Sequence, residues 1–218
     1  MKIGILFDLD GTLLDTLEDL KDAVNYALSY YGCPTRTLAE IRSFVGNGVR
    51  QLLQKSLPGK PTDPELETFL ETYQAYYARH SEDKTGPYPG VLQALEQIKR
   101  EYPIAIVSNK HHSAVETMCK SYFGDVYARG EQAGCPRKPA PDMIYATMRD
   151  LQIDGCIYVG DSEVDVETAR NANVPCLSVL WGFRDKDCLV NAGGKHFCDD
   201  AAQLPQMLKE MIEEYYGE

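Results

Sequence analysis

Several features that mark common protein classes are missing from this sequence. No stretch of its 218 residues has the length and apolar character of a membrane-spanning helix, so we expect no association with a membrane. The chain enters an apolar run at Lys2 without a charged leader and an apolar signal region, which predicts that it is not secreted. Internal repeats and low-complexity tracts are absent too, so a repeat architecture is excluded.

Positive charge is scarce. The 22 lysines and arginines are outnumbered by 33 aspartates and glutamates, which gives a formal net charge of −11 at pH 7. This balance argues against non-specific binding to nucleic acid. It also means that an anionic ligand needs locally concentrated positive charge, from a metal ion or from one or two well-placed basic side chains.

A cysteine framework is missing as well. The seven cysteines are an odd number, and no two of them are spaced C-x-x-C. This excludes the patterns typical of disulfide scaffolds and zinc sites, and it predicts a reduced, cytoplasmic protein. The apolar fraction of 44% and the charged fraction of 25% are ordinary for a globular protein, and the length allows one core with a smaller inserted domain.

The spacing of apolar residues divides the chain into two regions. Between about residues 15 and 83 they recur at helical intervals, and no segment has the pattern of a strand. After a connector rich in glycine and proline at 84–90, short apolar runs alternate with amphipathic segments to the end. Strands that alternate with helices imply right-handed crossovers and a parallel sheet.

We therefore predict an α/β fold: a Rossmann-like, doubly wound parallel sheet in a core domain of residues 1–14 and 84–218, and an inserted all-helical cap domain of residues 15–83. The expected strands cover 2–7, 104–107, 126–127, 157–159 and 176–180. The expected core helices cover 90–101, 112–122, 141–151, 163–172 and 201–216, and those of the insert cover 17–31, 37–57 with a break at 46–48, and 63–80.

The first strand ends in an acidic loop, Asp8-Leu9-Asp10-Gly11-Thr12. In an open α/β sheet, ligands bind beyond the carboxyl ends of the strands. Asp8 and Asp10 are two residues apart, so an extended backbone points both to one face, where two anions need a cation, a shared proton or bulk water. Gly11 allows the backbone to pass close to a bound group. The plain alternative is a solvated acidic turn.

Three more polar clusters stand beside predicted strands and helices. Ser108-Asn109-Lys110 follows one strand, Asp161-Ser162 follows another, and Lys138 precedes a helix. Because parallel strand ends meet at one edge, Asp8, Asp10, Ser108 and Asp161 should converge. Each cluster also has an ordinary interpretation when it is taken alone. In that interpretation, Ser108 or the Asp161–Ser162 pair would cap a helix, Lys138 would lie in solvent, and Asp165 would be only a first-turn acid.

Together the clusters supply what phosphoryl transfer needs. Asp8 can attack as a carboxylate and form an aspartyl-phosphate, and Asp10 can protonate the leaving alkoxide and then activate water. The hard oxygen ligands of Asp8 and Asp161 suit Mg²⁺.

The remaining groups suit a bound phosphate. Lys138 offers a point charge, and Ser108 can hold phosphoryl oxygens together with the backbone N–H groups near Asn109 and Gly11.

The string DLDGTLLDT at 8–16, followed by these clusters in this order, resembles the haloacid dehalogenase superfamily and within it the phosphoglycolate phosphatase-like phosphohydrolases. The resemblance covers essentially the whole core and the position of a helical cap. It implies that Asp8 is the nucleophile and Asp10 the general acid/base, with the backbone carbonyl of Asp10 also bound to the metal. It further implies a phosphate clamp of Ser108 and Lys138, a metal ligand at Asp161, and an orienting role for Asp165.

In the insert, the turn Val45–Arg50 stands out. Glycines flank Asn47, and the helix that follows would direct free N–H groups at an anion, while Arg50 adds a fork suited to a carboxylate or second phosphate. We expect Asn47 and Arg50 to recognise the non-phosphate end of a substrate; the alternative is a helix–helix turn with a solvated arginine. His111 and His112 are interpreted as surface residues, and Trp181 as a packing residue.

These observations predict a Mg²⁺-dependent phosphatase of small phosphorylated metabolites, phosphoglycolate-like, acting as a monomer or homodimer. The closest alternative is a sugar phosphomutase similar to β-phosphoglucomutase. A dehalogenase would not need an acid at Asp10. A non-catalytic protein that binds phosphorylated ligands is the alternative from another class, and such a protein would usually lose Asp8 or Asp10.

Overall fold

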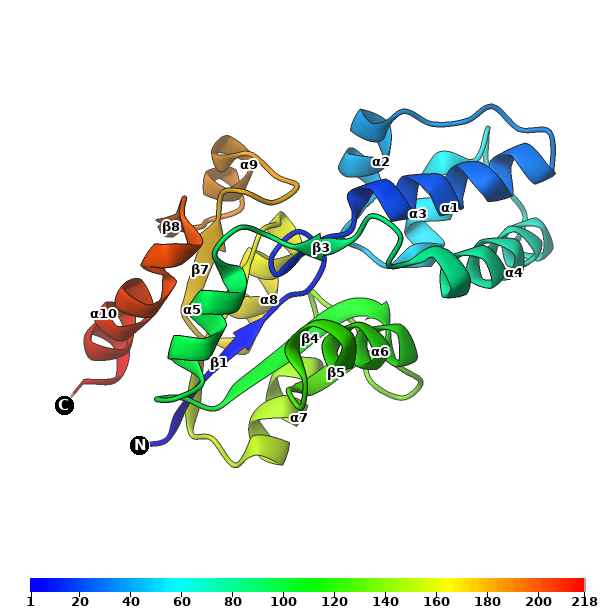
Figure 1. Cartoon of the computed structure of the whole chain (residues 1–218). Helices are drawn as coiled ribbons and strands as arrows, with labels where there is room; N and C mark the ends of the chain where they lie inside the picture. Colours follow the sequence, from blue (N-terminus) through cyan, green and yellow to red (C-terminus); the bar gives the residue numbers. More distant parts are fainter. Residues whose placement is uncertain (218) are drawn as a thin grey trace. The chain divides into compact units, whose positions relative to one another are not determined.

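The computed structural model describes residues 1–217 and divides into two compact units. The core unit comprises Met1–Leu14 and Pro87–Glu218, and the helical unit comprises Asp15–Gly86 (Figure 1). Within residues 1–217, no helix is both long and apolar enough to cross a bilayer.

The core unit is built on a six-stranded sheet with the order β5-β4-β1-β6-β7-β8, in which every neighbouring pair is parallel. All residues of β1 are buried, and each buried Ile, Leu or Phe side chain contributes about 1.5–3 kcal/mol to stability. The strands are β1 (Ile3–Phe7), β4 (Ile104–His111), β5 (Tyr127–Glu131), β6 (Gly155–Gly160), β7 (Cys176–Val179) and β8 (His196–Cys198).

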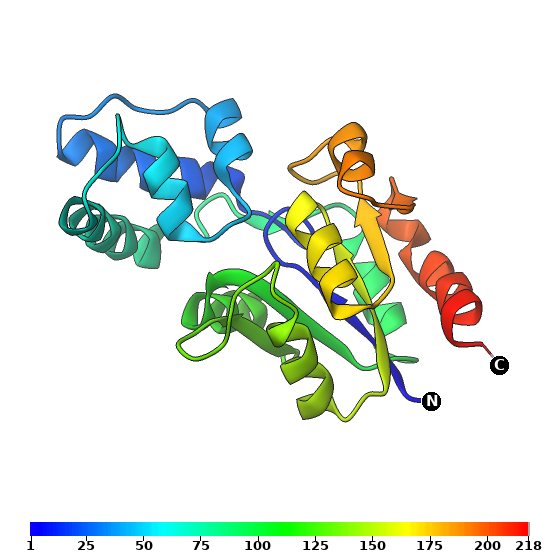
Figure 2. The same ribbon diagram turned by 180° about the vertical axis from the view of Figure 1, so that it is seen from behind.

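Helices cover both faces of this sheet. Helices α5 (Val91–Ile98), α6 (His112–Phe123) and α10 (Leu204–Tyr216) lie on the face turned forward in Figure 1. Helices α7 (Asp142–Leu151) and α8 (Glu163–Ala172) lie on the other face, in front in Figure 2. Between that second layer and the sheet lies a core cluster that includes Leu6, Val107, Met143, Tyr158 and Ala169.

The centre of the sheet sets the place of the site. Phe7, the last residue of β1, lies opposite Ile106 of β4 and Val159 of β6. The residues that follow these three paired positions therefore lie close to the same level of the sheet and meet at one edge, although β4 itself continues to His111. The prediction of a doubly wound parallel sheet is confirmed.

The helical unit consists of α1 (Leu17–Tyr30), α2 (Leu38–Phe44), α3 (Val49–Ser56) and α4 (Asp63–His80). Capping boxes begin α2 at Thr37–Glu40 and α4 at Thr62–Glu65, which satisfies backbone N–H groups that a helix start leaves open. Thr16 occupies the N-cap position of α1, but its buried hydroxyl accepts no capping hydrogen bond.

The two connectors of the helical unit are held together. The short strands β2 (Leu14–Asp15) and β3 (Gly86–Pro87) pair in a two-stranded sheet. Asp19, buried in the first turn of α1, accepts hydrogen bonds from the backbone N–H groups of Lys84 and Thr85 and from the Thr85 hydroxyl. The start and the end of the unit are thus joined by one carboxylate.

The structure adds elements that the sequence pattern did not indicate. Strand β4 runs on from the predicted 104–107 to His111, so Ser108 lies in a strand and does not cap α6, whose N-cap is His111. Helix α9 (Lys186–Asn191) and strand β8 were not expected. The expected last helix is split into a 3₁₀ turn, Ala201–Gln203, and α10.

Candidate active site

Asp8 directly follows β1, and its backbone N–H donates to the Val159 carbonyl oxygen at 2.8 Å. The side chain is buried. Lys138 Nζ lies 2.9 Å from Asp8 Oδ1, an ion pair without the angle of a hydrogen bond. Burial raises the pKa of Asp8 to about 7, against the lowering effect of Lys138 and with a further raising effect from Asp165. Without another cation nearby, this carboxylate is therefore unusually easy to protonate.

Lys138 is almost completely buried, with 1% of its surface exposed, so the alternative interpretation of a solvated lysine is wrong. Its ammonium donates to Tyr158 Oη at 2.7 Å and to Asp165 Oδ1 at 2.8 Å. Burial alone would lower the pKa of Lys138, but the charges of Asp165 and Asp8 outweigh it and raise the pKa above its usual value. The ammonium thus stays charged in the centre of the site.

Asp165 combines two roles. Its Oδ2 accepts hydrogen bonds from the Ser162 backbone N–H at 3.1 Å and from the Ser162 hydroxyl at 2.6 Å, which forms the capping box of α8. Its Oδ1 accepts from Lys138 and from Tyr158. A first-turn acid of α8 therefore fixes the ammonium of Lys138 as well.

Asp161 directly follows β6, next to these groups. Its Oδ1 accepts from the Thr12 hydroxyl at 3.0 Å, and its Oδ2 accepts from the Phe183 N–H at 2.7 Å. Burial, with Asp165 and Asp8 nearby, raises the pKa of Asp161 well above its ordinary value. Gly11, with φ of 85°, passes so close that an added Cβ would lie 2.4 Å from a carboxylate oxygen of Asp161. Only glycine fits this conformation and this space.

The carboxylates form one cluster. Asp8, Asp161 and Asp165 each offer an oxygen, and these atoms lie within 4.8 Å of one another. Asp165 accepts a hydrogen bond from the charged Lys138 ammonium, whereas the donors to Asp161 are the neutral Thr12 hydroxyl and Phe183 N–H, so Asp8 and Asp161 are the better ligands. An all-oxygen set with raised pKa values fits a hard divalent cation. The structure places the side chain of Asp165 in this cluster, whereas the sequence prediction named Asp8, Asp161 and the backbone carbonyl of Asp10 as the metal ligands.

Ser108 and Asn109 lie in the second half of β4, and both are buried. The Ser108 hydroxyl oxygen accepts from the Lys110 N–H at 3.3 Å. The Asn109 side chain donates to the Lys138 carbonyl oxygen at 2.9 Å and accepts from the Lys138 N–H at 2.8 Å. Asn109 therefore fixes the backbone that carries Lys138.

Asp10 makes a separate contact. The Lys110 ammonium donates to Asp10 Oδ1 at 2.8 Å. The structure thus brings Asp8, Asp10, Gly11, Ser108, Asn109, Lys138, Asp161 and Asp165 to one edge of the sheet. Asn47 and Arg50 belong to the helical unit, where Arg50 forms an ion pair with Glu67.

Three contributors to the site were not identified from the sequence. Tyr158 sits within an apolar strand and looks like core, yet a fully buried tyrosine needs a partner for its hydroxyl, and that was the available signal. Thr12 lies in the acidic loop at 8–12 and Lys110 in the cluster at 108–110, but neither motif indicated a role for these two side chains. Trp181 donates to the Thr12 carbonyl oxygen at 3.0 Å, a contact within the protein.

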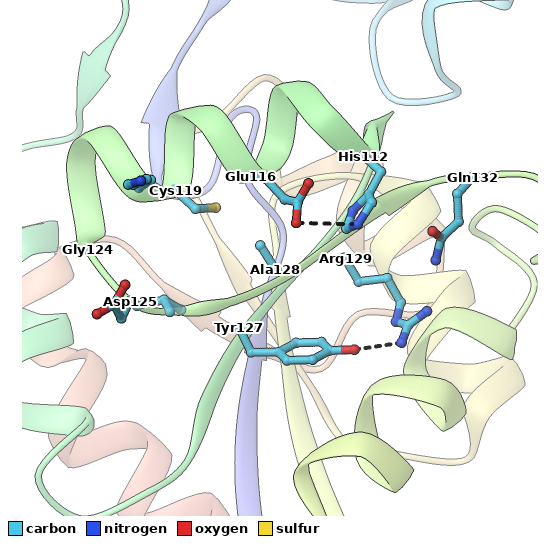
Figure 3. Close-up of a pocket in the computed structure, with 11 residues that line it drawn as sticks. His112, Glu116, Cys119, Gly124, Asp125, Tyr127, Ala128, Arg129 and Gln132 are labelled. Carbon is cyan, nitrogen blue, oxygen red and sulfur yellow. Dashed lines mark hydrogen bonds and ion pairs between the residues drawn. The ribbon is translucent and has the colours of Figure 1, made fainter.

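A pocket of about 470 Å³ lies between α6 and β5 (Figure 3). His112 and Glu116, one turn apart on α6, approach each other on one side of it, and Arg129 pairs with Asp150 and donates to the Tyr127 hydroxyl oxygen. Its charges are therefore largely matched within the protein. His112 Nδ1 also accepts from the Gly130 N–H, so this histidine has a structural contact.

A family model described as haloacid dehalogenase-like hydrolase matches residues 5–179. The chain belongs to the haloacid dehalogenase-like hydrolase family. The match includes the last residues of β1 with the acidic loop, Ser108 and Asn109 of β4, Lys138, and Asp161 and Asp165 after β6. The predicted family and the predicted hydrolase class are confirmed.

Individual relatives agree over nearly the whole chain. The phosphoglycolate phosphatase of Rhodobacter capsulatus is 33% identical over 96% of this chain and 98% of its own length. That of Cereibacter sphaeroides is 36% identical over 83% of this chain and 86% of its own length. A solved structure from Lactobacillus delbrueckii subsp. bulgaricus, provisionally described as a phosphoglycolate phosphatase, is 34% identical, with a TM-score of 0.86 over 94% of this chain and 97% of that one. The chain is thus similar to phosphoglycolate phosphatases within the family.

Proposed function

We propose that this protein is a Mg²⁺-dependent phosphatase that hydrolyses small phosphate monoesters through an aspartyl-phosphate at Asp8. The observation that carries the proposal is the buried Asp8 carboxylate at the carboxyl end of β1, 2.9 Å from the Lys138 ammonium and beside Asp161. A nucleophile, a fixed positive charge and a second acid at one strand end are what phosphoryl transfer requires.

The proposed reaction has two steps. A carboxylate oxygen of Asp8 attacks phosphorus while the bond from phosphorus to the leaving oxygen breaks, and Asp10 gives that oxygen a proton. Asp10 then takes a proton from a water molecule, which attacks the phosphorus and releases Asp8 and inorganic phosphate. One acid thus serves both halves of the reaction.

Lys138 and Ser108 are proposed to hold the phosphoryl oxygens. An ammonium has three N–H donors; two of those of Lys138 donate to Tyr158 and Asp165, and the third is left for the side of Asp8, whose Oδ1 lies 2.9 Å from the nitrogen. When Asp8 carries a phosphoryl group, the donor that faced Asp8 can turn to a phosphoryl oxygen, while the other two keep the ammonium in place. Asn109 and Gly11 would add backbone N–H groups.

Asp8 and Asp161 would hold Mg²⁺ through their side chains, with the backbone carbonyl of Asp10. The bound cation would neutralise charge on the phosphoryl oxygens and favour the ionised form of Asp8. The raised pKa values of Asp8, about 7, and of Asp161 support this assignment, because they report anions that lack enough positive charge.

The substrate is proposed to be a small phosphorylated metabolite of the phosphoglycolate type. The support is the similarity to phosphoglycolate phosphatases over most of the chain. Asn47 and Arg50 of the helical unit would then recognise the non-phosphate end. All seven cysteines are free thiols, which is compatible with the proposed cytoplasmic location.

The test is release of phosphate from p-nitrophenyl phosphate and 2-phosphoglycolate. We expect turnover of both in Mg²⁺, loss in a chelator, and recovery when Mg²⁺ is returned. Asp8→Asn should lower turnover by about three orders of magnitude or more without loss of folding, whereas Asp142→Asn, an exposed first-turn acid of α7, should leave turnover unchanged. Full activity without metal, or ordinary activity in Asp8→Asn, would contradict the proposal.

A further inference from the structure

Lys110 is a buried lysine whose ammonium the mechanism above does not use. It donates to Asp10 Oδ1 at 2.8 Å across a sequence separation of 100 residues. The exposed fractions of the two side chains are only 8% for Lys110 and 14% for Asp10. Lysine is almost never buried unless it is paired, so this contact has a reason other than chance meeting at a surface.

The backbone of Lys110 is fixed on both sides. Its N–H donates to the Ser108 hydroxyl oxygen at 3.3 Å, and the neighbouring Asn109 is bonded to the backbone of Lys138. On the other side, the Lys110 carbonyl lies so close to β5 that a Cβ added to Gly130 would be 2.5 Å from its oxygen.

The strand also changes its register at this point. The pairing of β4 with β5 shifts between Val107 and His111, and such irregularities redirect side chains, often next to active sites. The shift lies in the segment that presents both Ser108 and Lys110 at the edge where β1 ends. The ammonium therefore reaches Asp10 from a rigid support.

A carboxylate with one oxygen anchored keeps one orientation and offers the other oxygen for proton exchange. Displacement of a reacting group by about 1 Å can cost about 10²-fold in rate. We propose that Lys110 is a positioning residue, which holds Asp10 in the orientation from which it protonates the leaving oxygen of the substrate. This inference rests on the proposed phosphatase function and adds a residue to it.

The test compares kcat/KM for three substrates that differ in one property each. The leaving oxygen of p-nitrophenyl phosphate needs little protonation, that of glycerol phosphate needs it, and 2-phosphoglycolate needs it and adds a carboxylate. The variants are Lys110→Met, which removes the donor, and Lys110→Arg, which keeps a charged donor. Lys99→Met is the matched control, because Lys99 pairs with Glu96 on an exposed helix end. Thermal unfolding reports folding.

We expect Lys110→Met to lower kcat/KM for glycerol phosphate and 2-phosphoglycolate by about tenfold or more, and for p-nitrophenyl phosphate by less than about threefold. Lys110→Arg should recover most of the loss, and Lys99→Met should match the wild type. If Lys110→Met does not fold, Lys110→Gln takes its place with the same expectation.

Two results would overturn the inference. An equal loss on all three substrates would mean that Lys110 only supports the fold. A loss confined to KM for 2-phosphoglycolate would mean that Lys110 binds the substrate carboxylate instead. If the wild type were inactive on every substrate, the phosphatase proposal itself would fail, and the role of Lys110 would fall with it.

Discussion

Asp161 and Asp165 lie four residues apart at the junction of β6 and α8, and they differ in how fully hydrogen bonds and a neighbouring positive charge compensate their buried carboxylates. Asp165 accepts hydrogen bonds on both oxygens from Lys138, Tyr158 and Ser162. Asp161 is just as buried; its Oδ1 accepts from the neutral Thr12 hydroxyl and its Oδ2 from the neutral Phe183 N–H, and burial raises its pKa strongly.

The contrast separates support from chemistry within one cluster. A buried charge that is fully hydrogen-bonded fixes its neighbours and has little capacity for anything else. A buried charge short of partners is costly to the folded protein, and it binds a cation or a proton readily. Asp165 belongs to the first kind, and Asp8 and Asp161 to the second.

The largest expected effect on stability comes from removing the charge of Asp165, the fully hydrogen-bonded carboxylate. Asp165→Asn removes the charge that compensates the Lys138 ammonium in the interior and weakens the capping box of α8. We expect the free energy of unfolding to fall by about 3–5 kcal/mol, the usual cost of breaking a buried ion pair. Urea denaturation measures this. The control, Asp142→Asn, replaces an exposed first-turn acid, and equal losses in the two variants would contradict the contrast.

In the absence of metal, Asp8 and Asp161 should make the free energy of unfolding depend on pH. The pKa of Asp8 is about 7 in the folded protein against 3.8 for the ordinary group, so the folded state binds the proton more tightly. The Asp8 contribution to stability is therefore lost as pH rises from about 4 towards 7. The contribution of Asp161 to stability should also be lost as pH rises, because its pKa is raised as well.

Urea denaturation in a chelator between pH 5 and pH 8 tests this expectation. Asp8→Asn should flatten the decline in unfolding free energy, and at pH 8 it should be no less stable than the wild type. An unchanged slope in that variant would show that Asp8 is not the group that titrates.

The smallest effect on stability is expected in the helical unit, where the Arg50–Glu67 ion pair is largely exposed. Arg50→Ala should cost about 0.5 kcal/mol or less in unfolding free energy. Its kinetic effect tests the proposed recognition of substrate. For an anionic substrate, kcat/KM should fall by a factor that corresponds to about 1–3 kcal/mol of transition-state stabilisation, and for an aryl phosphate it should fall far less. Equal effects on both substrates, or none, would leave Arg50 without that role.

Much of the fold could be predicted because its signals are local. The apolar run before Asp8 and the alternation after residue 90 depend on neighbouring residues, and they indicated the parallel sheet correctly. Strand β8 and helix α9 were missed because they are short and lie among glycines and charged residues. The extension of β4 to His111 depends on pairing with β5, which the sequence of β4 alone does not reveal.

The site follows the same rule. Motif residues such as Asp8 and Asp161 could be named because strand ends of a parallel sheet meet. Their partners could not, because the contact of Tyr158 with Lys138 and that of Lys110 with Asp10 join segments far apart in sequence. Asp165 was interpreted as a first-turn acid or as an orienting residue, and in the structure a single side chain forms the capping box of α8 and fixes Lys138.

The buried carboxylate of Asp19 gives the helical unit the properties of a cassette. Its bonds to Lys84 and Thr85, with the pairing of β2 and β3, bring the entry and exit of the insert together. A segment whose two ends are adjacent can be lengthened, shortened or exchanged without stretching the sheet into which it is spliced. The chemistry at the strand ends and the segment between residues 15 and 86 can therefore diversify separately, with new specificities acquired by exchange of a part.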